Sequence, residues 1–148
     1  MEETKKSSFQ FEGFQIIKSH IEKIGFEKVS NNIELNFNPR GEKDDPEKTF
    51  RLFLGINIAD KEKTFIANIE AVGFFKYLIE TEESLLTNFF YVNAPAILFP
   101  YLRAYISTLT TLSGFETITL PTINFTFLGN TLKEHTKEIH SDPKLELE

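Results

Sequence analysis

The side chains best suited to metal binding or acid–base chemistry are the three histidines, His20, His135 and His140. His135 and His140 lie five positions apart, whereas a metal-binding pair on a helix needs a spacing of three or four residues. Glu134 and Glu138 lie beside them, and this mixture is typical of a solvated charged face. His20 stands alone in a stretch that alternates apolar and polar residues. The histidines therefore predict no metal site.

Other catalytic signatures are also missing from the sequence. It has no glycine-rich phosphate loop, no G-x-S-x-G motif and no acid pair that the pattern alone places together. It has no cysteine, which excludes disulfides, cysteine-based zinc sites and thiol nucleophiles. Asn124-Phe125-Thr126 matches a glycosylation acceptor, but the polar N-terminus lacks the apolar core of a secretion signal. We expect a cytoplasmic protein that is not an enzyme and uses no cofactor.

The unusual feature of the composition is its aromatic content. The 148 residues, a length that favours a single domain, include 16 Phe and 4 Tyr but no Trp. The net charge of −6 disfavours nucleic acid, which requires a basic face. No uncharged apolar run is long enough to cross a bilayer. The phenylalanines either fill an ordinary core or, in part, line a groove for apolar segments of other molecules.

Alternating hydrophobicity between Phe9 and Ala71 predicts a four-stranded antiparallel meander. The apolar positions change parity at Gly13, where a β-bulge would redirect the side chains. Later alternating stretches cover residues 32–37, 50–58 and 64–71. Residues 38–48 are expected to form a charged surface loop, and residues 60–63 a short turn. Such short connections favour antiparallel pairing of successive strands.

A long helix is expected after the sheet, starting near Thr81-Glu82-Glu83 and ending at Gly114. Pro100 lies inside it, and an interior proline costs about 3 kcal/mol. Between residues 96 and 112 the polar positions are Arg103, Ser107, Thr110 and Thr111, which form one narrow stripe. The sheet alone covers only one side of so apolar a helix. We therefore expect a second copy of the chain on its other side.

The remaining segments complete an α+β fold with both helices on one side of the sheet. A second, weaker helix is expected from about residue 125 to residue 139. Residues 1–8 are expected to be a disordered tail and residues 141–148 a flexible one. Residues 9–140 then form a single domain.

The middle of the chain resembles the SecB family of protein-export chaperones. The residues that carry the resemblance are Ile97-Leu98-Phe99-Pro100-Tyr101-Leu102-Arg103, then Ser113-Gly114-Phe115, then Leu120-Pro121-Thr122-Ile123-Asn124-Phe125. In that family an ILFPYAR-type helix is followed by a glycine–phenylalanine turn and a loop ending in P-(I/V)-N-F. The likeness extends from about Phe9 to Leu132 and is most specific in the helix and the loop.

This resemblance implies ATP-independent binding of unfolded or nascent preproteins in long apolar grooves. It also implies a homotetramer built as a dimer of dimers, without nucleic acid or membrane insertion, which hands its clients to the ATPase SecA. The groove would be lined by the second strand, the end of the fourth, the crossover loop and the second helix. The candidate groove residues are Ile33, Leu35, Phe37, Phe74, Phe75, Leu78, Phe115, Leu120, Ile123, Phe125 and Leu128. For each of them, ordinary core packing is the alternative.

The resemblance also implies two further contact surfaces. Candidates for the helix-to-helix oligomer contact are Tyr101, Arg103, Tyr105, Ile106 and Leu109. The family docks SecA through carboxylates on the exposed sheet face, where this chain has Ser19, Lys23 and Asn68 at the matching places. Only Glu22, Glu34 and Glu70 lie nearby to compensate. Two alternatives to an export chaperone therefore stay open: a SecB-like chaperone dedicated to a toxin–antitoxin module, and an oligomeric scaffold without clients.

Overall fold

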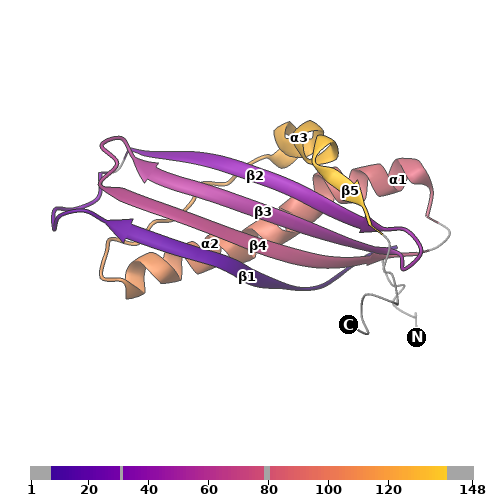
Figure 1. The fold of residues 1–148 in the computed structure, drawn as a ribbon, viewed down its shortest axis with the longest axis horizontal. Coiled ribbons are helices and arrows are strands. Elements are labelled where there is room, and N and C mark those ends of the chain that lie inside the picture. Colours follow the sequence, from indigo (N-terminus) through magenta and orange to yellow (C-terminus); the bar gives the residue numbers. More distant parts are fainter. Residues whose placement is uncertain (1–7, 31, 79–80, 140–148) are drawn as a thin grey trace, which may run out of the picture.

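The protein is an α+β structure, here a computed structural model that describes residues 8–30, 32–78 and 81–139. The strands are β1 (Phe9–Lys23), β2 (Ile33–Asp44), β3 (Thr49–Asp60), β4 (Phe65–Tyr77) and β5 (Thr136–Glu138). The helices are α1 (Glu83–Asn88), the π-helical turn η1 (Phe89–Asn93), α2 (Ala94–Leu112), the 3-10 turn η2 (Phe125–Leu128) and α3 (Gly129–Glu134). Figure 1 shows α2 running behind the sheet and α3 beyond β2. The predicted fold class is confirmed.

Over the described residues the sheet has five strands in the order β1-β4-β3-β2-β5, not the four that the sequence predicts. β2, β3 and β4 form the predicted antiparallel meander. β1 does not lie beside β2. It pairs with β4 at the opposite edge, which gives a Greek-key arrangement. The short β5 is parallel to β2 and was not predicted.

Two irregularities in β1 keep its apolar residues on the helix-covered face. The register with β4 shifts between Phe11 and Gly13 and again between Ile16 and Lys18. Gly13 has a φ of 133°, a value that favours glycine. The predicted bulge at Gly13 is therefore confirmed. The second shift was missed, and it turns Ser19 toward α2, where Tyr105 Oη donates a hydrogen bond to Ser19 Oγ (2.6 Å).

The loop predicted over residues 38–48 is wrong, because β2 continues to Asp44 and only a tight turn remains. Pro39 and Gly41 lie within the strand. Gly41 donates its N–H to His135 O (3.2 Å), away from β3. Pro39 lies two residues before Gly41, so its backbone nitrogen also faces the outer edge of β2 and not β3. No hydrogen bond to β3 is lost, and this is the strand position where proline is tolerated.

The second helix predicted to reach residue 139 is also wrong at its C-terminal end. α3 stops at Glu134, and Thr136 Oγ1 donates to Leu132 O (2.6 Å) as the chain turns into β5. β5 then packs closely on β2 at Gly41, where an added Cβ would lie 2.7 Å from Thr136 Oγ1. A glycine in β2 therefore makes room for β5.

The hydrophobic core lies between the sheet and α2. Leu98, Leu102 and Ile106 repeat every four residues along α2 and are fully buried. A Cβ at Gly73 of β4 would lie 3.3 Å from Leu98, so this glycine allows the helix to approach the sheet closely. The core also contains Phe50 and Phe75, which lie on the inward face of β3 and β4. These contacts fix α2 across the sheet.

The start and end of the predicted long helix are confirmed. The helical run begins at Glu83, directly after the expected Thr81-Glu82-Glu83 start, and Gly114 beyond its end has a φ of 86°. Pro100 and Ala96 are both exposed. The carbonyl of Ala96, left without its partner by Pro100, is therefore free to bond water. This explains how the helix tolerates the proline.

The predicted polar stripe on α2 is not a solvent-facing one. Thr110 is buried and accepts a hydrogen bond from Ile118 N (3.0 Å), while Ser107 Oγ donates to Ile118 O (3.0 Å). Both side chains fasten the crossover loop, residues 113–124, to the helix. The exposed positions of α2 consist of Ala96, Pro100, Tyr101, Ala104, Thr108, Thr111 and Leu112. The exposed positions of α2 thus carry no charge.

The helical run Glu83–Leu112 is long and apolar enough to cross a membrane by length and composition alone. Its α2 portion is the central helix of the core, with Leu98 and Leu102 fully buried against the sheet. A core helix passes the same test, so the run does not indicate a membrane protein. The predicted tails, apart from Ser8, lie outside the described residues.

Hydrogen bonds to Asp60 and Asp45 stabilise the two hairpin turns that flank β3. Asp60 accepts hydrogen bonds from Thr64 Oγ1 and from Phe65 N (3.0 Å), which together lower the pKa of its carboxyl. At the other end, Tyr77 Oη donates to Asp45 Oδ1 (2.9 Å), and Lys48 Nζ lies 3.3 Å from the same oxygen. This hydrogen bond and the lysine lower the pKa of Asp45, and burial raises the pKa of Tyr77.

The Asp45–Tyr77 contact predicts a pH-dependent loss of stability on the acid side. The folded pKa of Asp45 is below its unfolded value of about 3.9, so the carboxylate stabilises the fold above that pH. The stabilisation is lost as the pH falls through the folded pKa. Asp45→Asn should therefore lower the free energy of unfolding at pH 6, and the difference from wild type should shrink as the pH approaches about 3. Urea titrations at several pH values would measure it.

Tyr77→Phe is the matched control, because it removes the hydroxyl that donates to Asp45. In this background Asp45→Asn should show a smaller pH-dependent difference. A difference between Asp45→Asn and wild type that stays constant between pH 3 and pH 7 would contradict the role of this contact.

Candidate functional site

The candidate site is an aromatic surface where β2, α2 and η2 meet. Phe37 of β2 makes edge-to-face contacts with Phe99 of α2 (ring centroids 6.1 Å apart) and Phe125 of η2 (5.6 Å). Phe99 and Phe125 contact each other at 4.7 Å. Phe127 stacks on Phe125 at 6.4 Å and is 61% exposed. A chain of rings therefore leads from the core out to solvent.

The first half of β2 continues this surface. Ile33, Leu35 and Phe37 are half-buried and pack against the core, while Glu34 and Asn36 between them are exposed on the other face. Ile123 of the crossover loop is also half-buried against the core. We call the surface formed by Ile33, Leu35, Phe37, Ile123, Phe125 and Phe127 the β2 groove. Its described lining has no charged side chain, so it offers apolar burial rather than recognition of charge.

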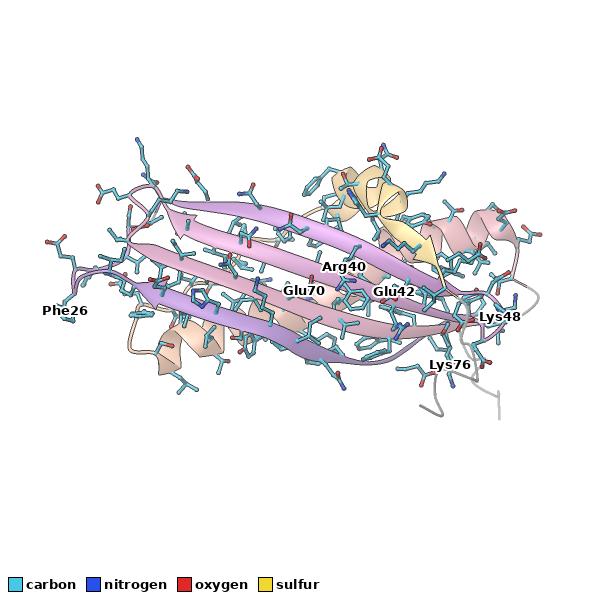
Figure 2. All side chains as sticks on the ribbon, viewed as in Figure 1. Phe26, Arg40, Glu42, Lys48, Glu70 and Lys76 are labelled. Carbon is cyan, nitrogen blue, oxygen red and sulfur yellow. The ribbon has the colours of Figure 1, made fainter. Side chains whose placement is uncertain are left out.

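A hollow of about 300 Å³ opens at the Ile33 end of the β2 groove. It is lined by Val29 and Ser30 before β2 and by residues 116–119 of the crossover loop. The ion pair between Lys28 Nζ and Glu116 Oε1 (3.2 Å) joins these two loops beside it. Figure 2 places Phe26 at this end of the molecule, and its side chain is fully exposed. This end of the molecule therefore combines a largely polar hollow with a separate, exposed phenylalanine.

Some predicted groove residues do not lie on this surface. Phe74 lies on the opposite face of the sheet, because the inward positions of β4 are its neighbours Gly73 and Phe75. Phe75 and Leu120 are inside the core, at 1% and 0% exposure. Leu78 is 54% exposed but follows the far end of β4, beside Ser8. Phe74 thus lies on the outer face, Phe75 and Leu120 in the core, and Leu78 at the far end of the sheet.

Three further predicted groove residues, Phe115, Phe125 and Leu128, lie beneath the groove or beside it. Phe125 and Leu128 are 5% exposed, so they support the surface from below more than they offer area. Phe115 is half-buried and contacts the ring of Phe65 at 5.8 Å, near the β3–β4 hairpin. Phe99, Phe127 and Phe26 were missed. Phe99 lies in the helix motif that was assigned to assembly, and no pattern in a loop distinguishes an exposed phenylalanine from a buried one.

Of the residues predicted for the oligomer contact, one is in the core and the other four are at least partly exposed. Ile106 is 1% exposed and belongs to the core, so it is not available to a second subunit. Tyr101 packs on Phe11 (5.4 Å) and Phe14 (4.7 Å) of β1 but keeps 42% of its surface exposed. Tyr105 bonds Ser19, and Arg103 and Leu109 are half-buried.

The outer face of the sheet combines apolar side chains, among them Phe53 and Phe74, with acids that have partners. Glu22 lies 3.5 Å from His20, Glu34 lies 3.2 Å from Lys63 and Glu70 lies 3.5 Å from Arg40. Figure 2 shows Arg40 and Glu70 side by side on this face, and Arg40 also stacks over Phe53 at 3.7 Å. Asn68 shares this face, whereas Ser19 faces α2. In residues 8–30, 32–78 and 81–139, no group of three acidic or histidine side chains is placed to hold a metal ion.

Comparison with protein families matches residues 11–135 to SecB, described as the preprotein translocase subunit SecB. The chain belongs to the SecB family. It is 30% identical to the protein-export protein SecB of Buchnera aphidicola, over 84% of this chain and 93% of that one. It is 31% identical to an uncharacterised protein of Methanocaldococcus jannaschii, over 93% of both chains.

Among solved structures the chain is similar to a SecB-like chaperone of Mycobacterium tuberculosis in complex with a ChAD peptide from the HigA1 antitoxin. The TM-score is 0.67 over 78% of this chain and 88% of that one, at 19% sequence identity, so this likeness concerns the fold. SecB is a chaperone family and not an enzyme family. Membership therefore supports a chaperone role, and the β2 groove is the candidate site for it.

The separation between core and groove predicts unequal effects of two phenylalanine substitutions. Phe75→Ala should lower the free energy of unfolding by about 3–5 kcal/mol, because the ring is enclosed by the core and its loss leaves a cavity. Phe127→Ala should change it by less than about 1 kcal/mol, because most of that ring already faces water. Guanidinium titrations of both variants would measure this. Equal losses would place Phe127 in the core and contradict the groove.

Proposed function

We propose that this SecB-family protein is an ATP-independent holding chaperone of the cytoplasm, formed by a single domain over residues 9–140. It binds unfolded or nascent preproteins in the β2 groove and keeps them competent for export and for handover to SecA. The observation that carries the proposal is the ring chain of Phe37, Phe99, Phe125 and Phe127, which extends from the core to an exposed edge without a charge.

Apolar burial explains why such a site holds many clients without nucleotide. Each Å² of apolar area removed from water contributes about 25 cal/mol, less the cost of ordering the client chain. The contacts depend on apolar area and shape rather than on a sequence of donors and acceptors. A folded protein offers little such area in an extended segment, so the groove selects unfolded chains.

The proposal includes a homotetramer arranged as a dimer of dimers. Its support is the exposed side of α2, where Pro100, Tyr101, Ala104 and Leu112 form a neutral, largely apolar face, with Leu112 82% exposed. A contiguous face of this kind marks a contact surface, and symmetric assembly of identical chains is the commonest solution. Tyr101, Arg103, Tyr105 and Leu109 remain the predicted contact residues.

Handover to SecA rests on the outer face of the sheet. Glu22, Glu34 and Glu70 all lie there, as the proposed docking surface requires. Each has an exposed or half-exposed partner in the same chain, His20, Lys63 or Arg40, and surface pairs of this kind contribute only about 0–1 kcal/mol. Basic residues of a partner are therefore able to replace these side chains at small cost.

The alternative is a SecB-like chaperone dedicated to an antitoxin. It is favoured by the fold likeness to the SecB-like chaperone that was solved with an antitoxin peptide. Both chaperones would use the same groove, so the two alternatives differ in the client and in the need for SecA.

Suppression of aggregation tests the chaperone role. The protein should keep a chemically denatured, signal-bearing preprotein soluble on dilution without nucleotide. Phe37→Ser should weaken this activity about tenfold or more, because it removes the ring at the centre of the groove. Phe53→Ser is the matched control, since this half-buried phenylalanine lies on the opposite face of the sheet. Light scattering should show the mass of four chains for both variants.

Three outcomes would overturn parts of this proposal. No suppression by the wild-type protein would leave an oligomeric scaffold without clients. Equal activity of Phe37→Ser and the wild type would move the client site away from the β2 groove. Titration with SecA decides the export role: saturable binding that Glu34→Lys weakens is expected, and no binding would favour the dedicated chaperone.

A further inference from the structure

The loop between β1 and β2 carries the most exposed large apolar side chain of the described residues. Phe26 is fully exposed, and Ile24, two positions before it, is 61% exposed. Between them Gly25 has a φ of 75°, and nothing lies within 4 Å of the position that a Cβ would occupy there. The chain therefore turns sharply at an open point and leaves two apolar side chains in solvent. We call Ile24, Gly25 and Phe26 the apolar tip.

The apolar tip stands clear of the rest of the molecule. Hollows of about 310 Å³ and 490 Å³ separate it from the crossover loop and from the turn between β3 and β4. Figure 2 places Phe26 at one end of the long axis and Lys48, in the turn after β2, at the other. A surface that the molecule approaches end-on therefore meets this tip before it meets the sheet.

The backbone of the tip is hydrogen-bonded within the protein. Ile24 N donates to Thr64 O (2.7 Å). Lys23 Nζ donates to Ile24 O (3.0 Å) and to Gly25 O (3.2 Å), so this lysine lies against its own loop. In a lipid interface a carbonyl or N–H group without a partner is costly, whereas in water it is not. The tip therefore joins exposed apolar side chains to backbone groups that need no water.

The charges around the tip balance. Residues 23–28, the turn residues 60–63 and Glu116 contain equal numbers of lysines and acids. Lys28 pairs with Glu116 (3.2 Å), and Lys63 pairs with Glu34 (3.2 Å). A neutral set of charges has no net attraction for nucleic acid or for a strongly charged surface. Zwitterionic lipid headgroups, which carry one positive and one negative group each, offer partners to both signs.

The small size of the tip favours a soft surface over a folded partner. A stable protein–protein contact buries about 800 Å² on each partner, which is far more than two side chains on a loop supply. A lipid interface has no such requirement, because the lipids close around an inserted side chain.

We propose that the apolar tip inserts reversibly into the headgroup boundary of a zwitterionic lipid bilayer and holds the protein at the membrane surface. Phe26 and Ile24 enter the boundary, while the lysines and acids around them stay among the headgroups. The chain does not span the bilayer. One tip gives weak attachment, and each further copy in the proposed tetramer would add another. The tip is separate from the β2 groove, so a bound client need not be released for the protein to reach a membrane.

The absence of tryptophan from the chain allows a direct test. Phe26→Trp and Phe127→Trp each introduce a single tryptophan, at exposed positions of the tip and of the β2 groove. The probe is a phosphatidylcholine vesicle, without a client. The fluorescence from position 26 should shift to shorter wavelength and become protected from acrylamide, and the fluorescence from position 127 should not change. No shift at position 26, or an equal or larger shift at position 127, would overturn the proposal.

Serine variants measure how much the tip contributes. Phe26→Ser should lower partition into vesicles about tenfold in flotation assays, because the ring no longer leaves water on binding. Phe127→Ser is the matched control and should float like the wild type. Both side chains are mostly exposed, so the unfolding temperature should change little in either variant. Equal flotation of Phe26→Ser and the wild type would contradict the proposal.

Two other outcomes would assign the tip to a different occupant and overturn the proposal. A fluorescence shift at position 26 that appears without vesicles as the protein concentration rises would assign the tip to a second copy of the chain. Loss of aggregation suppression by Phe26→Ser, with vesicle partition unchanged, would make the tip a client contact.

Discussion

The packing of α2 across the inner face of the sheet is the contact on which the other features depend. Leu98, Leu102 and Ile106 fill the space against β3 and β4, and Gly73 lets the helix lie close to the strands. Thr110 and Ser107 at the C-terminal half of the helix bind the backbone of Ile118, so the crossover loop follows the helix. The loop then carries Ile123 and Phe125 to β2. The position of the aromatic surface is thus a consequence of where α2 lies.

The same packing leaves two apolar surfaces outside the core, and they have different character. The exposed side of α2 is a continuous helix face, which suits a second copy with the same face. The β2 groove lies at the sheet border and is lined mainly by half-buried side chains. β5 covers one part of this border, and Pro39 separates that part from the rest.

The sequence predicted the fold class, the bulge at Gly13 and both ends of the long helical run, because each depends on local spacing or on one glycine. It did not predict that β1 pairs with β4, since strand order depends on contacts between residues far apart in the chain. Asn38 to Asp44 contains proline, glycine and charges, which are typical of a loop, yet their strand is stabilised by pairing with β3. Periodicity also marked Phe37 and Phe75 as equally apolar. Only the packing of α2 separates the enclosed Phe75 from the half-exposed Phe37.

Site-specific photo-crosslinking to a denatured preprotein tests most directly where this protein holds a client. A benzophenone-bearing phenylalanine analogue would replace Phe127, which is exposed at the outer end of the groove rings, and in a second variant Phe53 on the outer sheet face. The account predicts efficient crosslinks to the client from position 127 and few from position 53. Crosslinks from position 53 alone, or equal crosslinks from both positions, would contradict the assignment of the client site to the β2 groove.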